Sequence, residues 1–171
     1  MLTPLRRFGA GLQRLPRWAG PLLALAWMAF IRQLSSMPSG DEPVSFPRSW
    51  LANAAHAPLF GLLALWWILA LPRREGWPVL GRGALLAVLG LVLAYGALDE
   101  WHQASVPGRH ASVLDLTTDV VGAACTLWLA VYVGAPGASA GGTLRRIGLG
   151  LLVCALAGLA ATWASLGGAA R

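Results

Sequence analysis

The chain has 171 residues, of which 57% are hydrophobic and 12% are charged. Because a soluble domain carries about 25% charged residues, this composition excludes an ordinary soluble domain and predicts an all-α, polytopic bundle of about five transmembrane helices. The net charge of +6 comes from arginine without any lysine, and these arginines separate apolar segments instead of forming one basic face, so we expect no nucleic-acid partner.

Five apolar segments follow one another along the chain. We expect each to form a membrane-spanning helix, because lipid offers the backbone no hydrogen-bond partner. The first and third are short, with 14 and 16 uncharged residues between their flanking charges, and they span only if those charged side chains reach the interfaces. No A-x-A-like site closes the first segment, which favours a retained anchor over a cleaved signal peptide. The segments are residues 18–34, 50–71, 83–101, 113–133 and 147–166.

These segments divide the chain into four regions. Residues 1–17 form a basic cytoplasmic segment, and residues 18–133 form a four-helix membrane domain. Residues 134–146 begin with a run of small residues and are expected to form a flexible cytoplasmic loop. Residues 147–171 hold a C-terminal transmembrane helix.

The distribution of arginine predicts the orientation. Nine arginines fall on the side of the N-terminus, three fall on the opposite side, and Arg32 lies near the boundary of that opposite side. The positive-inside rule therefore predicts a cytoplasmic N-terminus and an external C-terminus. Residues 35–38, 53–56 and 99–119 then all lie at the outer face. The nine are Arg6, Arg7, Arg14, Arg17, Arg73, Arg74, Arg82, Arg145 and Arg146; the three are Arg48, Arg109 and Arg171.

Residues 99–119 carry four of the seven acidic residues and two of the three histidines, between two apolar segments. On a helix, Asp99 shares a face with His102 and Gln103, three and four positions later. Glu100 points about 100° away from Asp99. We interpret Glu100 either as a solvated interfacial acid or as part of a binding site.

The second half of this stretch predicts a turn followed by a capped helix. Pro107 presets φ for the turn and Gly108 is free to adopt a positive φ. Ser112 and Asp115 match a capping signature at the start of the fourth segment. Asp115, Asp119 and Gly122 follow one face of that helix, with Gly122 as a packing position. Asp115 is interpreted as a cap partner, which excludes no second role.

Asp119 is the least ordinary residue of the set. It lies almost two turns inside an apolar span, where a carboxylate costs about 2.5–3.5 kcal/mol on insertion scales. We therefore expect it to face the bundle interior, either neutral or beside a cation: Arg109, His102 or His56. His56 is read equally as a satisfied interfacial histidine or a site residue. His110 is expected to be exposed, and nothing marks Ser105 as an activated nucleophile.

The motif in residues 99–122 resembles the signature of a known protein family. The stretch DEWHQASVPGRHASVLDLTTDVVGA resembles the signature of the VanZ-like family of bacterial membrane proteins, roughly D-E-x-x-Q-x-x-x-P-G-R-x-x-x-x-x-D-x-x-x-N/D-x-x-G. Residues 35–38, SSMP, look like the family's S-S-x-P, and NAAHAPLFGLL keeps the family's histidine as His56 but has Asn53 and Phe60 where lysine and tyrosine are common. The resemblance covers about residues 20–133. It implies a place in the bacterial cytoplasmic membrane and an association with low-level teicoplanin resistance, and it leaves the chemistry open.

Two hypotheses of function remain. In the first, Arg109, the turn amides and the start of the fourth helix hold an anionic lipid headgroup or a lipid-linked cell-wall precursor. Gln103, Glu100, His56 and Ser36 add contacts. In the alternative, the chain is a membrane-embedded acid–base enzyme acting on a phosphate-containing lipid. Its candidate catalytic residues are Asp99, His102, Asp115 and Asp119.

Other functions have less support. The acids and His56 are of ligand type for a divalent metal, but no H-x-x-x-H or H-E-x-x-H spacing is present, so we expect no metal and no cofactor. Cys125 and Cys154 lie in apolar stretches and are interpreted as small buried hydrophobes. A transporter is disfavoured because the acids gather near one face. Membrane lipids are the expected partners, and the sequence predicts no particular protein partner.

Overall fold

The computed structural model describes residues 11, 14–38, 45–74, 76–109 and 111–169. His110, Arg6, Arg7 and Arg171, on which sequence predictions fall, lie outside these residues. The described elements are α2 (Ala19–Ser35), α3 (Phe46–Ala70), β1 (Arg73–Arg74), β2 (Trp77–Pro78), α4 (Arg82–Gln103), α5 (Val113–Val133) and α6 (Ala140–Ala169). The two short strands pair antiparallel, with Arg73 opposite Pro78.

The helices confirm the predicted all-α class. Helices α3, α4, α5 and α6 are each long and apolar enough to cross a membrane, so the chain is a multi-pass membrane protein. Helix α2, at 17 residues, is about 25 Å long at 1.5 Å per residue. That falls short of the roughly 30 Å hydrocarbon core. Length and composition thus confirm four of the five expected spans.

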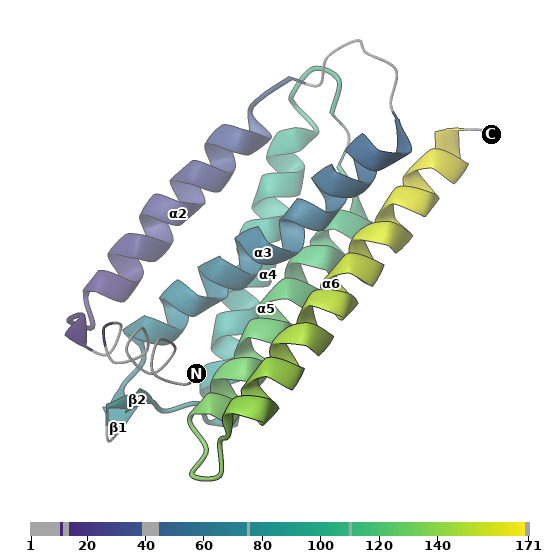
Figure 1. Ribbon diagram of the computed structural model, residues 1–171. Coiled ribbons are helices and arrows are strands. Elements are labelled where there is room, and N and C mark those ends of the chain that lie inside the picture. Colours follow the sequence, from purple (N-terminus) through teal and green to yellow (C-terminus); the bar gives the residue numbers. More distant parts are fainter. Residues whose placement is uncertain (1–10, 12–13, 39–44, 75, 110, 170–171) are drawn as a thin grey trace.

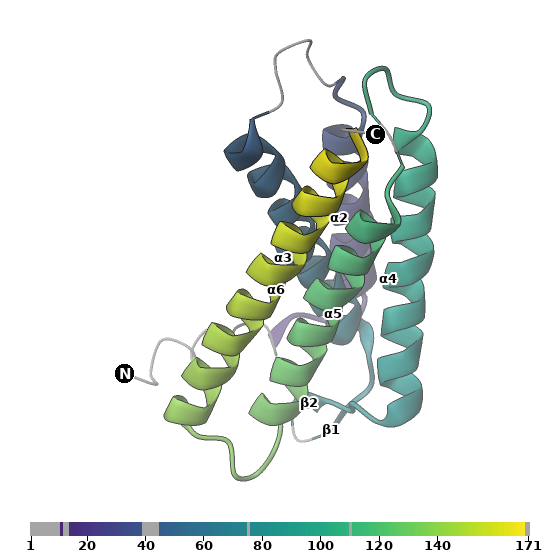
Figure 2. The same cartoon turned by 90° about the vertical axis from the view of Figure 1, so that its right-hand side faces the viewer.

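Helices α3 and α5 form the central pair of the bundle. Helix α6 lies against both of them, α2 packs mainly on α3, and α4 packs mainly on α5 (Figures 1 and 2). The central pair meets at Gly122, where an added Cβ would collide with the backbone of Ala57. Close approach of this kind is how membrane helices gain packing energy without a hydrophobic driving force.

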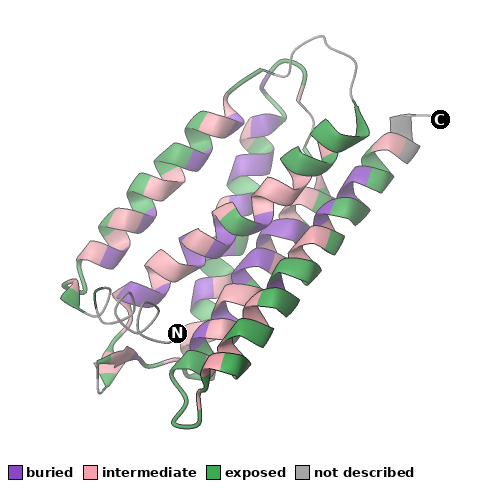
Figure 3. Cartoon of the chain, viewed as in Figure 1, coloured by how far each residue is buried: buried purple, intermediate pink, exposed green. Residues whose placement is uncertain are grey.

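The buried core runs along the contacts of α3 with its neighbours, and the outer faces are apolar. Phe60, Leu63 and Val92 are fully buried. Large apolar side chains such as Leu151 and Trp163 are exposed on α6, and Figure 3 shows exposed residues along the outward sides of the helices. In a soluble protein such a surface would aggregate, whereas here it faces lipid.

The two ends of the bundle differ in charge. The start of α2, the strands and the α5–α6 loop lie at one end, while the end of α2 and the α4–α5 turn lie at the other (Figure 1). The described arginines separate in the same way as the sequence predicted. The first end holds Arg14, Arg17, Arg73, Arg74, Arg82, Arg145 and Arg146, and the second holds Arg32, Arg48 and Arg109.

The predicted cytoplasmic loop is shorter than expected. Helix α6 begins at Ala140, so residues 140–146, expected to belong to a flexible loop, are helical. The reason is a local cap: the Ser139 hydroxyl accepts the Gly142 N–H at 3.1 Å, which satisfies a donor in the first turn. The Arg146 guanidinium also lies 3.5 Å from the centre of the Tyr132 ring, which holds the start of α6 against the end of α5.

Candidate functional site

Helix α4 continues through the acidic motif and ends in a tight turn. Gly108 has φ 73°, in the region that favours glycine, and the Arg109 N–H closes the turn on the Val106 carbonyl at 3.1 Å. Ser112 then caps α5, since its hydroxyl accepts the Asp115 N–H at 3.3 Å. The turn and the cap have the form that the residues predicted.

Asp99 faces α2. It is 3% exposed, and its Oδ2 accepts hydrogen bonds from the Ser35 hydroxyl at 2.7 Å and from the Gln103 amide at 3.0 Å. Ser35 was not among the predicted site residues, although it adjoins Ser36 in the SSMP stretch. These bonds tie the end of α2 to the end of α4.

Ser36 and His102 make a second tie between the same helices. The Ser36 hydroxyl donates to the Arg32 carbonyl at 2.7 Å and lies 2.9 Å from His102 Nε2. Because the hydroxyl has a single proton, His102 is the donor in the second bond. His102 and Ser36, predicted as catalytic and ligand-binding residues, are therefore engaged with each other.

Arg109 also belongs to this α2-facing side. Its guanidinium donates to the carbonyls of Met37 at 2.9 Å and Leu34 at 3.2 Å, and to the Gln103 side-chain oxygen at 3.3 Å. Within the described residues it forms no salt bridge, so it is not the cation beside Asp119 that the sequence offered as one of three candidates. The carbonyls that follow a helix lack partners within it, and a cation is favourable at a helix C-terminus.

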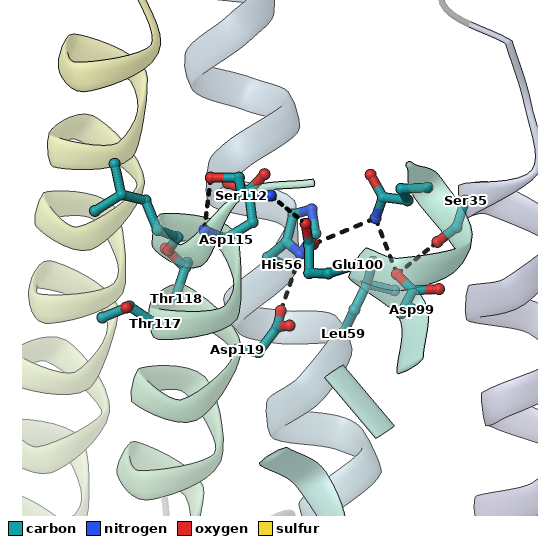
Figure 4. A network of polar contacts seen from close by, with 12 residues as sticks. Ser35, His56, Leu59, Asp99, Glu100, Ser112, Asp115, Thr117, Thr118 and Asp119 are labelled. Atoms are coloured by element: carbon teal, nitrogen blue, oxygen red, sulfur yellow. Dashed lines mark hydrogen bonds and ion pairs between the residues drawn. The ribbon is translucent and has the colours of Figure 1, made fainter. Parts of the chain in front are cut away.

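His56 and Asp119 form a second group of site residues, separate from the residues that face α2. His56 Nδ1 and Asp119 Oδ1 are 2.9 Å apart. Asp119 is 1% exposed, whereas the His56 side chain keeps 15% of its surface exposed. Of the three cationic partners expected for Asp119, the structure places His56 beside it (Figure 4).

Glu100 is buried between α4 and α5, with 6% of its surface exposed. The prediction of a solvated interfacial acid is therefore wrong. Since it points away from Asp99 around the helix, Glu100 faces the start of α5, where its Oε2 accepts the Ser112 N–H at 2.6 Å. The unpaired N–H groups at a helix N-terminus favour a carboxylate there.

Four ionisable side chains from three helices converge at this point. One ligand-type atom each from His56, Glu100 and Asp115 lies within 4.8 Å of the other two. Figure 4 shows these residues and Asp119 directed toward a common space, from α3, α4 and α5. We refer to His56, Glu100, Asp115 and Asp119 as the His–acid cluster.

In the part of the chain that the structure describes, three buried carboxylate oxygens have no hydrogen-bond partner. They are Oδ1 of Asp99, Oδ1 of Asp115 and Oδ2 of Asp119. An unsatisfied buried acceptor is unfavourable, so hydrogen bonding within the described residues does not account for these three oxygens. The cluster has the groups to exchange protons and to bind a cation, an amine or a hydroxyl.

An apolar cavity of about 670 Å³ lies between α3, α5 and α6. Its lining includes Ala57, which follows His56 in the sequence, and Gly122, which lies three residues after Asp119 on α5. The cavity extends to Arg146, near the opposite end of the bundle. No sequence pattern indicates this cavity, because it depends on how α6 packs. Ser105, by contrast, donates to the His102 carbonyl on the exposed turn, away from the cluster.

A protein-family model described as VanZ/LLP1 matches residues 12–134, which is most of the chain and includes every residue of the His–acid cluster. Helix α6 lies beyond the matched residues. No curated protein and no solved structure matches the chain.

Proposed function

The chain belongs to the VanZ/LLP1 family, and from that membership we propose that it binds a phosphate-bearing lipid headgroup at the outer face of the bacterial cytoplasmic membrane. The headgroup belongs to an anionic lipid or to a lipid-linked cell-wall precursor. Through this binding the protein modulates envelope properties, including susceptibility to teicoplanin-type glycopeptides, an expectation that rests on the family resemblance.

The observation that carries this proposal is the His–acid cluster itself. Four ionisable groups converge between α3, α4 and α5 with buried oxygens that lack partners. His56 and Asp115 are only partly buried, so the cluster is open toward that end of the bundle. Ionisable groups inside a membrane bundle usually mark a functional site, and the unpartnered oxygens leave this one able to contact a ligand.

Arg109 supports a phosphate beside the cluster, because its guanidinium binds Gln103, whose amide lies 3.5 Å from Glu100 Oε1. A guanidinium has five N–H donors, and three hydrogen bonds of Arg109 go to protein oxygens. Two N–H groups therefore remain for a headgroup, and the bonds to α2 hold the planar group in place. Planar N–H donors recognise phosphate with a geometry that lysine does not copy.

The apolar cavity supports a lipid rather than a water-soluble ligand. It passes beside Ala57 and Gly122, close to the cluster, and runs between membrane-spanning helices toward Arg146. An acyl chain placed in this cavity would bring its headgroup to the cluster end. The segregation of seven described arginines at the opposite end supports an external position for the cluster.

A second candidate function is acid–base catalysis on the same lipid. The observation that favours it is the His56–Asp119 pair at 2.9 Å, since a base oriented by a buried carboxylate is a recurrent catalytic arrangement. In this case His56 exchanges the proton, and Asp119 positions the ring.

Native mass spectrometry of the full chain, supplied with a lipid-linked pyrophosphate and with phosphatidylglycerol, tests the binding proposal. We expect wild type to retain phosphate-bearing lipid and Arg109→Lys to retain at most about a tenth as much, as loss of a bidentate charged contact implies. Arg32→Lys, a matched change at the same end of the bundle, should bind as wild type does. Equal lipid binding by Arg109→Lys and wild type would refute the role of Arg109.

Conversion of the same lipids in nanodiscs tests the catalytic candidate. Wild type should release a product that His56→Gln does not, while His102→Gln, which changes the histidine outside the cluster, should retain conversion. If wild type leaves both lipids intact, catalysis is excluded for these substrates.

A further inference from the structure

We propose that the His–acid cluster is a divalent-cation site, in which His56, Glu100 and Asp115 are the ligands and Asp119 positions His56. The cation is of the Mn²⁺ or Zn²⁺ type. Imidazole nitrogen suits transition metals and carboxylate oxygen suits Mn²⁺ and harder ions, and a site with one of the first and two of the second fits this class.

The spacing of the ligand atoms fits a single ion. Ligands bound at about 2.0–2.2 Å to one zinc lie about 3.0–3.5 Å apart around it. The three candidate atoms lie within 4.8 Å of one another, so small side-chain rotations bring them into range. They come from α3, α4 and α5, and each sits on a helix whose backbone is fixed by packing.

Asp119 supplies the second, independent observation. It is 1% exposed and directed into the cluster, and its Oδ2 has no hydrogen-bond partner. Its Oδ1 lies 2.9 Å from His56 Nδ1. When the Asp119 carboxylate is ionised it accepts the Nδ1–H of His56, and the neutral ring then has its lone pair on Nε2, where it can bind a metal. Metal-binding histidines commonly donate their other N–H to a carboxylate in this way.

Charge balance points to the same conclusion. Glu100, Asp115 and Asp119 gather around one imidazole, and among the described residues no arginine forms a salt bridge with any of these carboxylates. Buried charges need a partner of opposite sign. A divalent cation would provide that charge to a cluster in which Oδ1 of Asp115 and Oδ2 of Asp119 have no hydrogen-bond partner.

The cation also explains how an acidic cluster accepts an anionic ligand, a step that rests on the proposed function. Three protein ligands leave coordination positions open, and a phosphate oxygen would occupy one while Arg109 contacts another oxygen of the same group. His56 is then a ligand and not a base while the metal is bound, which separates this arrangement from the catalytic candidate.

Titration of the purified full chain, free of any purification tag, tests the site. Protein stripped with EDTA in detergent is titrated with MnCl₂ and with ZnCl₂, and both bound metal and Tm are measured. We expect one cation per chain and a rise in Tm with cation concentration, because a ligand that binds only the folded state stabilises it. Glu100→Gln and Asp115→Asn should each weaken binding at least tenfold, and Asp119→Asn by roughly 10- to 100-fold.

Two control variants keep the test specific. Asp99→Asn removes a buried carboxylate on the α2-facing side, and His102→Gln removes a histidine outside the cluster; both should bind the cation as wild type does. Failure of wild type to bind either ion at millimolar concentration would overturn the site. Unchanged affinity in both Glu100→Gln and Asp115→Asn would overturn it too, and wild type decides the matter if a variant does not fold.

Native mass spectrometry with phosphatidylglycerol, with and without EDTA, separates this proposal from the proposed function. Lipid binding that requires the cation supports both. Cation binding without lipid binding supports the site and contradicts the headgroup proposal. Lipid binding that is equal with and without EDTA, in a chain that takes up neither ion, overturns the cation site and leaves the proposed function standing.

Discussion

The two ends of the bundle handle charge in opposite ways. At the end that holds most described arginines, side chains reach the surface or bind backbone carbonyls: Arg73 donates to the Leu15 carbonyl at 2.9 Å, and Arg17 lies 3.4 Å from the Ala70 carbonyl. At the other end, Glu100 and Asp119 are buried between helices. Among the described residues, the arginines of the first end are exposed or partly exposed, whereas Glu100 and Asp119 are buried.

The length of the side chain and the role of its charge account for this difference between the two ends. Arginine has a long stem that carries its charge to the interface, so its exact place matters little to packing and its sign determines orientation. Aspartate is short, and Asp119 has no route to water from within α5. Because inserting such a residue into the membrane is unfavourable, a carboxylate at this position indicates a functional role for its charge. Changes at the acidic end should therefore have far larger effects than changes at the arginine end.

Removal of the imidazole should have the largest effect. His56→Ala leaves Asp119 buried without its one hydrogen-bond partner, and breaking a buried pair in this way costs about 3–5 kcal/mol. We expect a decrease of about 3 kcal/mol in the free energy of unfolding, measured by chemical denaturation in detergent. The double variant His56→Ala/Asp119→Ala should be more stable than the single one. A single variant as stable as wild type would mean that Asp119 does not depend on His56.

The α2-facing side should respond less strongly. Asp99→Ala removes the acceptor shared by Ser35 and Gln103 and leaves two buried donors without it. Such groups cost about 1–3 kcal/mol, so we expect a loss of about 2 kcal/mol. Asp99→Asn keeps one acceptor oxygen and should lose less than half as much. The two unfolding curves, recorded side by side, check this order.

Substitution of Arg109 should have an intermediate effect on stability. Arg109→Lys keeps the charge but replaces three directed bonds to Met37, Leu34 and Gln103 with one flexible ammonium. We expect a loss of about 1 kcal/mol, the typical net contribution of a hydrogen bond, and faster hydrogen exchange at the end of α2. If exchange in α2 stays as in wild type, Arg109 does not hold that helix.

Much of this architecture follows from the sequence. Apolar segment lengths predict α5 at residues 113–133, and the Ser112 cap and the Gly108 turn follow from local rules. The start of α6 at residue 140 does not, because a string of small residues looks like a loop until the Ser139 cap and the Arg146–Tyr132 contact are seen.

The sequence predicts which residues belong to the site, but it does not predict which of them contact one another. The i, i+4 rule places Gln103 beside Asp99, as the structure shows. Whether Asp119 meets Arg109 or His56 depends on how α3 and α5 rotate against each other at Gly122, and no local pattern encodes that. Arg109 was expected among acids, and it lies instead on the carbonyls that end α2.

The smallest effect on stability should come from the arginine end, where Arg74 is exposed on the short strand β1. Surface ion pairs contribute about 0–1 kcal/mol, so the free energy of unfolding of Arg74→Ala should lie within about 0.5 kcal/mol of the wild-type value.

The arginines of this end bear instead on the orientation of the protein in the membrane, which a labelling experiment measures directly. In a chain with Cys125 and Cys154 replaced by alanine, Ser105→Cys at the acidic end should react with a membrane-impermeant thiol reagent in intact cells. Arg74→Cys and Ala140→Cys should react only after the membrane is opened. Labelling of Arg74→Cys but not Ser105→Cys in intact cells would place the His–acid cluster in the cytoplasm, and a lipid of the outer leaflet would then no longer be its ligand.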